Sequence, residues 1–311
     1  MPRLTPHAPL RHGWRDVAAV HRLEYPFSIS YVCYAVWGAC FASPGAGGLV
    51  AGPVVAAAVA AFVLTVAGLA LNTAVDIRTD ERHAERHELA GAAKRLGGRL
   101  PALRWAIGEM AVGLAAALAV SVWVGHWAPV CVAAGIVVLH VLYNVEPVHL
   151  KRRGLAGPPA FCAAVIVLPC LLTHTAVTPV VEPSAWLVYF GLGVLAAGRL
   201  LWWSVPDIKA DAETGMATAP VRYGAARAVL LGCTVMVAGL VVTTWGLSWR
   251  AGAVAAVAGT AAHWVFVGVA ATMLGVLARG SVPDSGRMRT RSMSVMLVGD
   301  LALTVVALAS A

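Results

Sequence analysis

Nine continuous apolar runs of about 20 residues constrain the fold of this chain more than any other feature. A helix of about 20 residues crosses a hydrocarbon core of about 30 Å. The runs do not alternate apolar with polar residues, which excludes a membrane β-barrel. With 59% apolar and 12% charged residues, the chain carries about half the charge of a soluble domain. We predict an all-α, polytopic membrane protein with spans at residues 26–44, 51–76, 102–123, 128–146, 157–176, 185–206, 226–246, 251–277 and 290–310.

The basic residues predict how these spans are oriented. Of the 23 Lys and Arg residues, all except Arg199 and Arg250 fall in segments on one side of the predicted bundle. Positive residues concentrate in cytoplasmic loops. The N-terminus and the charged loops are therefore expected in the cytoplasm and the C-terminus outside. The net charge of +8 lies in these membrane-flanking loops, so we expect membrane lipids and no nucleic acid as partners.

The loops leave no room for a separate soluble domain. We expect one transmembrane domain over residues 1–311, with a cytoplasmic N-terminal segment at 1–25 and a cytoplasmic loop or lid at 77–101. The composition of that loop predicts a short amphipathic helix. The six cysteines fall within predicted spans and are expected to pack as apolar side chains.

Four of the chain's seven aspartates occur in two arrays of equal spacing. Asn72, Asp76 and Asp80 end the second predicted span, and Asp207 and Asp211 end the sixth. Residues i and i+4 share one face of a helix, so each array presents its polar side chains together. Close carboxylates near a membrane repel one another and require a compensating cation.

Mg²⁺ suits these arrays, because it takes hard oxygen ligands and bridges carboxylates to substrate phosphates. Two facing arrays would hold a diphosphate, with an isoprenoid tail in an apolar cavity. The metal would neutralise the departing pyrophosphate and leave an allylic cation in that cavity. The alternative is structural, with helix-end carboxylates that pair with Arg78, Arg82 and Lys209.

The segments "NTAVDIRTD" (72–80) and "DIKADAETGMATAPVRYG" (207–224) resemble the two Asp-rich motifs of the UbiA superfamily of intramembrane prenyltransferases. The segment "LYNVEPVHLKRRG" (142–154) is similar to the Tyr, Pro and Lys segment of that family. The resemblance implies a bundle of about nine helices, a central cavity that faces the cytoplasm, and Mg²⁺ as cofactor.

The resemblance also implies roles for individual residues. The four aspartates would be catalytic, and the implied Mg²⁺ ligands are Asn72, Asp76, Asp80, Asp207 and Asp211. The implied diphosphate-binding residues are Asn72, Tyr143, Lys151, Lys94, Arg95 and Arg199. The loop lacks the Arg-Pro-rich segment typical of the family, so which of its cations reaches the phosphates stays open.

Arg199, Glu109 and Asp300 are ionisable residues inside predicted spans, where such residues are rare unless paired or functional. Arg199 either pairs with Glu109 or Asp300, or acts at the site by orienting an acceptor or binding pyrophosphate. Glu109 is either its partner or a base that takes a proton from an acceptor or a carbocation.

The expected function is Mg²⁺-dependent ionisation of a prenyl diphosphate, with transfer of the prenyl group to an aromatic or lipid acceptor. A UbiA-type terpene cyclase needs the same metals and cavity and is the first alternative. An ion-coupled transporter is the second. Transporters place such carboxylates near the bilayer midplane, whereas these arrays end their spans at one membrane face.

Overall fold

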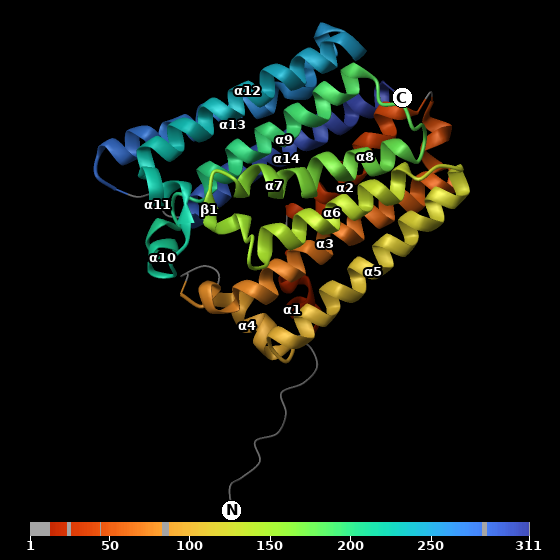
Figure 1. The fold of residues 1–311 in the computed structure, drawn as a ribbon. Coiled ribbons are helices and arrows are strands. Elements are labelled where there is room, and N and C mark those ends of the chain that lie inside the picture. Colours follow the sequence, from red (N-terminus) through yellow and green to blue (C-terminus); the bar gives the residue numbers. More distant parts are fainter. Residues whose placement is uncertain (1–12, 24–25, 44, 83–86, 282–284, 311) are drawn as a thin grey trace, which may run out of the picture.

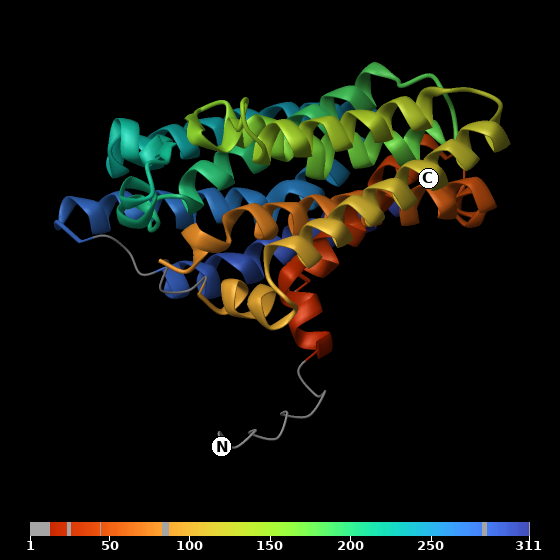
Figure 2. The ribbon, with the colours of Figure 1, turned by 60° about the horizontal axis from the view of Figure 1, so that its bottom comes forward.

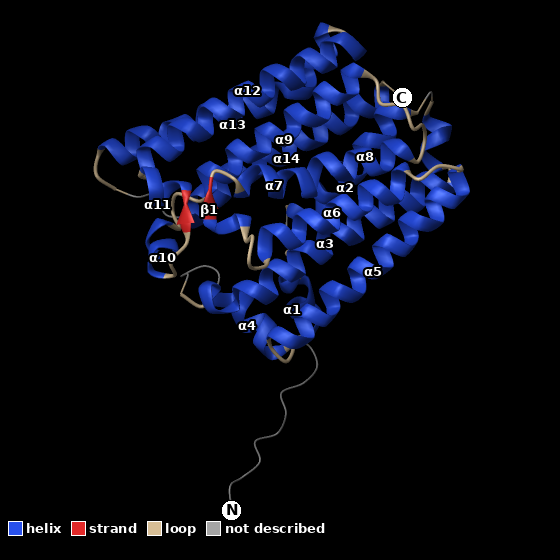
Figure 3. Cartoon of the chain, in the orientation of Figure 1, coloured by secondary structure: helices blue, strands red, loops and turns tan. Residues whose placement is uncertain are grey.

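The protein is a bundle of long helices that run side by side, as the computed structural model shows (Figure 1, Figure 3). The structure describes residues 13–23, 26–43, 45–82, 87–281 and 285–310. The long helices are α2 (Phe27–Ala42), α3 (Gly52–Asp80), α5 (Arg99–Val124), α6 (Ala128–Asn144), α9 (Pro183–Trp203), α12 (Ala225–Ala251), α13 (Ala253–Ala278) and α14 (Ser285–Ala309). A composite helix follows α6 and consists of α7 (Gly157–Cys162), the π-helical turn η4 (Ala163–Val167) and α8 (Leu168–Thr175).

Each predicted span coincides with one of these helices or with the composite helix. By length and composition, seven of the helices in the described residues are able to cross a membrane. Two others, α2 and α6, are apolar but shorter, with 16 and 17 residues. The chain is an integral multi-pass membrane protein. Nine crossings and the cytoplasmic position of the N-terminus stay predictions.

Local signals set the ends of several long helices. Proline stands in the first turn of α3, α6 and α9. The backbone N–H groups of a first turn have no partner within the helix, so proline costs no hydrogen bond there. Helix α5 ends at Gly125, whose φ of +79° is a left-handed cap that glycine adopts without steric cost. Between these ends, each helix forms hydrogen bonds between its own backbone N–H and carbonyl groups, because the bilayer core offers no water as a partner.

Several short elements lie at one end of the bundle, opposite the end where α14 terminates (Figure 1). They include α1 (Gly13–Val20), α4 (His87–Arg95), α10 (Ile208–Glu213) and α11 (Ala219–Tyr223). Helices α1 and α4 pack against each other there (Figure 2). The short helix predicted in loop 77–101 is confirmed as α4. Residues 1–12, 24–25 and 83–86 of the two predicted cytoplasmic segments lie outside the described residues.

A short parallel strand pair connects two of the motif-bearing segments. Strand β1 (Arg153–Gly154) follows the 3-10 turn η3 (Leu150–Arg152) and pairs with β2 (Ala217–Thr218), as the red arrows in Figure 3 show. The loop that carries Lys151 is thereby tied to the segment that follows α10. A second 3-10 turn, η2 (Ala46–Val50), joins α2 to α3.

The second Asp array is not the end of a membrane helix, contrary to the prediction. Helix α9 ends at Trp203, and a separate short helix, α10, starts with Asp207 as its N-cap residue. Pro206 explains the break, because it has no N–H to donate and disfavours helical geometry in the residue before it. The backbone N–H of Asp211 donates to the Asp207 carbonyl at 2.9 Å, so the i, i+4 relationship holds within α10.

Helices α9 and α12 approach so closely that glycine is required between them. A Cβ at Gly198 would lie 2.6 Å from the carbonyl oxygen of Gly232, and one at Gly239 would lie 2.3 Å from the backbone nitrogen of Leu195. Small residues allow such contact between membrane helices. This contact fixes the position of α9, which leads directly into the second Asp array.

Candidate active site

A cavity of about 940 Å³ opens between the long helices and the short elements. Its wall includes the aromatic side chains of Phe27, Tyr31, Tyr34, Phe161 and Trp203. Asp207 and Asp211 of the second array line it, whereas the first array lines it through Asn72, with Asp76 and Asp80 buried behind the lining. A cavity of this size that combines apolar wall with convergent polar groups is the usual form of a small-molecule site.

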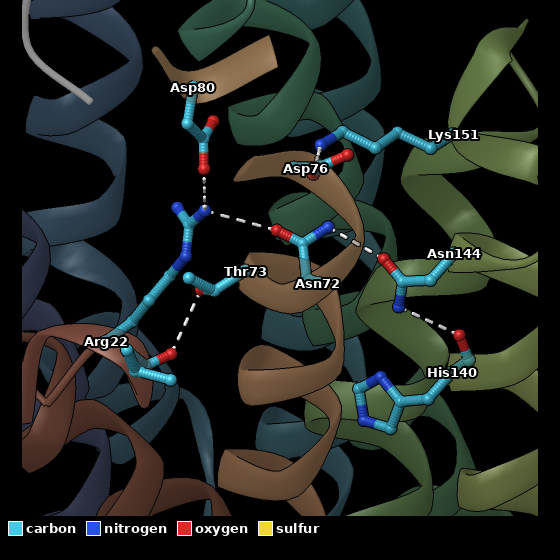
Figure 4. A network of polar contacts seen from close by, with 9 residues as sticks. Arg22, Asn72, Thr73, Asp76, Asp80, His140, Asn144 and Lys151 are labelled. Atoms are coloured by element: carbon cyan, nitrogen blue, oxygen red, sulfur yellow. Dashed lines mark hydrogen bonds and ion pairs between the residues drawn. The ribbon is translucent and has the colours of Figure 1, made fainter. Parts of the chain in front are cut away.

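The first array lies on one buried face of α3, as predicted (Figure 4). Asn72, Asp76 and Asp80 are 6%, 3% and 0% exposed. Lys151 forms an ion pair with Asp76. Arg22 Nη2 lies 3.7 Å from Oδ2 of Asp80 and donates to Oδ1 of Asn72 at 3.1 Å. Each carboxylate of the array therefore faces a cation from another segment.

The second array is held by the turn that follows α10. Thr218 Oγ1 donates to Oδ2 of the buried Asp211 at 2.9 Å, and the Met216 N–H donates to the Asp211 carbonyl at 2.8 Å. Gly215 makes this turn with a φ of +71°, which glycine adopts at little cost. The glycine after the array is thus a structural part of the motif.

A hydrogen bond between the ends of α3 and α10 links the two arrays. Arg82 Nη1 donates to the carbonyl of Glu213 at 3.4 Å, and both residues line the cavity. The arrays therefore share one cavity at the same end of the bundle.

The residues predicted to bind diphosphate divide into two groups. Tyr143, Lys151 and Arg199 line the cavity. Lys94 and Arg95 do not line it, contrary to the expectation for the loop. Lys94 forms an ion pair with Glu81. Arg95 Nη2 lies 2.6 Å from Oδ1 of Asp16, and this hydrogen bonding raises the pKa of Arg95.

The packing of α4 explains this correction. Helix α4 lies against α1, which carries Asp16. Its two terminal cations therefore find carboxylates on neighbouring elements at the periphery of the site.

Two residues of the site were missed by the sequence prediction, Arg22 and Asn144. The sequence identifies Arg22 only as one of the basic residues on the predicted cytoplasmic side. It follows α1 with a φ of +50°, and Thr73 Oγ1 anchors that segment by donating to the Val20 carbonyl at 3.0 Å. Asn144 accepts a hydrogen bond from Asn72 Nδ2 at 2.8 Å (Figure 4). Its position directly after Tyr143, in the third matched segment, was the available signal.

Arg199 forms no direct ion pair with Glu109 or Asp300 in the described residues, although its charge acts on Asp300. Glu109 Oε1 lies 2.8 Å from Nε2 of His21. Asp300 accepts hydrogen bonds from two hydroxyls of α2. Within the described part of the chain, no carboxylate lies within 4.0 Å of the Arg199 guanidinium. Glu109 also does not line the cavity, so the structure does not support its alternative role as a base.

Comparison with known proteins identifies the family. A model of the UbiA prenyltransferase family matches residues 31–297. The chain belongs to this family. The bacteriochlorophyll synthase 33 kDa chain of Cereibacter sphaeroides is 32% identical over 167 residues, which are 51% of this chain and 54% of that relative. The alignment thus spans about half the length of the relative.

Solved structures share the fold over nearly the whole chain. The UbiA homolog from Archaeoglobus fulgidus bound to GPP and Mg²⁺ superimposes with a TM-score of 0.67 at 14% identity, covering 94% of this chain and 99% of that chain. Its form bound to DMAPP and Mg²⁺ has a TM-score of 0.62 at 15% identity with the same coverage. At 14% and 15% sequence identity, these superpositions show a shared fold.

The donor atoms of this UbiA-family site fit a hard divalent cation. Among the described residues, no three Asp, Glu, His or Cys side chains form a single metal-binding group. Each array therefore offers few ligands at any one point. Mg²⁺ accepts such sites, because it keeps several waters and takes phosphate oxygens as ligands.

Proposed function

We propose that this protein is a Mg²⁺-dependent prenyltransferase that ionises an isoprenyl diphosphate and transfers the prenyl group to an acceptor. One observation supports the proposal: Asn72 of the first Asp array, both carboxylates of the second, and the cations Lys151 and Arg22 that face the first array line a single cavity. The GPP and DMAPP complexes of the A. fulgidus homolog support this substrate class.

The residues that would hold Mg²⁺ are Asn72, Asp76, Asp80, Asp207 and Asp211. Bound there, the metal would neutralise the negative charge that develops on the leaving pyrophosphate. The burial of the first array strengthens this electrostatic effect, because water screens it poorly there.

Lys151, Arg22 and Tyr143 are the residues that we assign to the diphosphate. Lys151 and Arg22 now contact carboxylates of the first array. Each can exchange a carboxylate for a phosphate oxygen, because both are acceptors of charge-assisted hydrogen bonds. Tyr143 lines the same cavity and offers a hydroxyl donor.

The apolar part of the cavity would receive the prenyl chain and the allylic cation. Aromatic faces stabilise a cation within about 6 Å by cation–π attraction. The rings of Tyr31 and Phe27 lie in this wall, with centroids 6.3 Å apart and planes at 11°.

The test is pyrophosphate release and product analysis with purified protein, Mg²⁺, and DMAPP, GPP or longer prenyl diphosphates. We expect release that depends on an added acceptor and that is lost in Asp76→Ala. Cyclic hydrocarbon or terpene alcohol without an acceptor would identify a cyclase instead. Absence of release from every prenyl diphosphate, with a panel of aromatic and lipid acceptors present, would contradict the proposal.

A further inference from the structure

Lys151 reaches the cavity from the short turn η3, which lies in the loop between α6 and α7. Its side chain is 12% exposed and forms an ion pair with Asp76. A lysine side chain is long and flexible, so it loses much rotamer freedom when it is held in one place. The contacts that fix η3 therefore help to set where the ammonium group lies.

The carboxylate of Glu146 connects the two ends of this turn. Glu146 follows α6, and its Oε1 lies 3.1 Å from Nδ1 of His149. Arg152 Nη1 donates to the same oxygen at 3.3 Å. An ionised carboxylate only accepts, so Nδ1 is the donor in the first contact. His149 and Arg152 flank Leu150 and Lys151 in the sequence, so one carboxylate holds both sides of the lysine.

The backbone at His149 shows what the contact with Glu146 stabilises. His149 has a φ of +40°, a left-handed conformation that costs free energy in a residue with a Cβ. The residue is buried, and its Nε2 has no hydrogen-bond partner among the described residues. The hydrogen bond of Nδ1 to Glu146 offsets part of the cost of this bend, which directs the chain into η3.

The loop is fixed on its other side by the strand pair. Gly154 of β1 pairs with Thr218 of β2, and Thr218 also donates to the carboxylate of Asp211. This pairing holds the chain after Lys151, whereas Glu146 holds it before and across Lys151. The lysine that faces the first Asp array thus lies between two supports, one of which leads to the second array.

We propose that Glu146 is a positioning residue that holds Lys151 for the diphosphate, an inference that rests on the proposed prenyl transfer. The side chain of Glu146 is 64% exposed and does not line the cavity, so it acts through the loop. With the turn held, the Lys151 ammonium group exchanges Asp76 for a phosphate oxygen while the loop keeps its conformation. A lysine that is ordered beforehand loses less conformational entropy when the substrate binds.

The test compares the affinity of purified protein, with Mg²⁺ present, for a non-hydrolysable thiolo analogue of GPP. Glu146→Ala should weaken binding about threefold to tenfold, the size expected for hydrogen bonds at an exposed site. Glu146→Gln should restore most of the affinity, because its carboxamide oxygen accepts the same hydrogen bonds. In Lys151→Gln protein, Glu146→Ala should change the affinity by less than about twofold, because an indirect effect disappears with the residue that transmits it.

Glu182→Ala is the matched control. Glu182 is 67% exposed, pairs with Arg250 at 3.0 Å and does not line the cavity, so this variant should bind the analogue like the wild type. Equal affinities of the wild type and Glu146→Ala overturn the positioning role, and so does an equal loss in Lys151→Gln protein. Failure of the proposed function is a separate result, in which the wild type itself neither binds the analogue nor releases pyrophosphate from GPP. That result overturns both.

Discussion

Asn72 donates a 2.8 Å hydrogen bond from Nδ2 to Oδ1 of Asn144, which leaves the Asn72 carboxamide oxygen 3.1 Å from Arg22 Nη2 (Figure 4). Asn144 is held in turn, because its own Nδ2 donates to the His140 carbonyl at 2.8 Å. The pair sets which way the Asn72 amide faces. Asn144 is therefore a positioning residue for the oxygen that the metal would use.

We expect Asn144→Leu to weaken Mg²⁺ binding at the site. Without the acceptor on α6, the Asn72 amide is free to rotate, and loss of such supporting contacts costs about 10–100-fold in metal affinity or activity. The Mg²⁺ concentration at half-maximal pyrophosphate release should rise, with little change in KM for GPP. Ser121→Ala removes the acceptor of a 3.0 Å hydrogen bond that the Val130 N–H donates between α6 and α5, and it serves as control because neither residue lines the cavity. An unaltered Mg²⁺ dependence in Asn144→Leu would refute the positioning role.

Arg22→Gln should raise KM for the prenyl diphosphate. A hydrogen bond from a charged group contributes about 1.5–3 kcal/mol, which corresponds to about 10–100-fold. Arg95→Gln removes the same charge from a residue that contacts Asp16 and does not line the cavity, so its KM should stay close to wild type. The comparison is made by steady-state kinetics at saturating Mg²⁺. If Arg95→Gln raised KM and Arg22→Gln did not, the diphosphate contact would belong to the loop.

The spans and the first Asp array were predictable because both follow from local geometry. Apolar runs of membrane length form helices, and α3 continues to Asp80, so i, i+4 spacing places the array on one face. The second array was placed on the wrong helix. Pro206, directly before Asp207, was the visible sign of the break.

The contacts of Arg22, Asn144 and Arg199 were not predictable in the same way. Arg22 reaches Asn72 across 50 residues, and Asn144 reaches it across 72. Such contacts depend on how α1 and α6 dock on α3, and spacing along the chain carries no information about that docking. For Arg199, the sequence shows Glu109 and Asp300 in other spans but carries no information on which residues lie beside the guanidinium.

Gly239→Ala should destabilise the protein. The added methyl carbon would lie 2.3 Å from the Leu195 nitrogen and 2.7 Å from the Gly191 carbonyl oxygen. These are backbone atoms, so α9 and α12 must separate, at a cost of about 1–3 kcal/mol. Thermal unfolding in detergent measures the effect. Gly275→Ala in α13 is the matched control, because no atom lies within 4 Å of its added Cβ. Equal unfolding temperatures for the two variants would contradict the close contact.

The docking of α1 should weaken as pH rises. Burial of His21 opposes its protonation, but hydrogen bonds to Glu109 and to the Val17 carbonyl, with the charge of Glu109, outweigh burial and raise the pKa of His21 above 6.5. A group with a raised pKa in the folded state contributes stability that is fully present below 6.5 and is lost as pH rises through the folded-state value. The unfolding temperature of the wild type should therefore fall relative to His21→Gln between about pH 6 and pH 8. Because Arg22 follows His21 directly, KM for GPP should rise over the same interval in the wild type and change less in His21→Gln. A difference between the two proteins that is constant with pH would exclude the His21–Glu109 contact as its source.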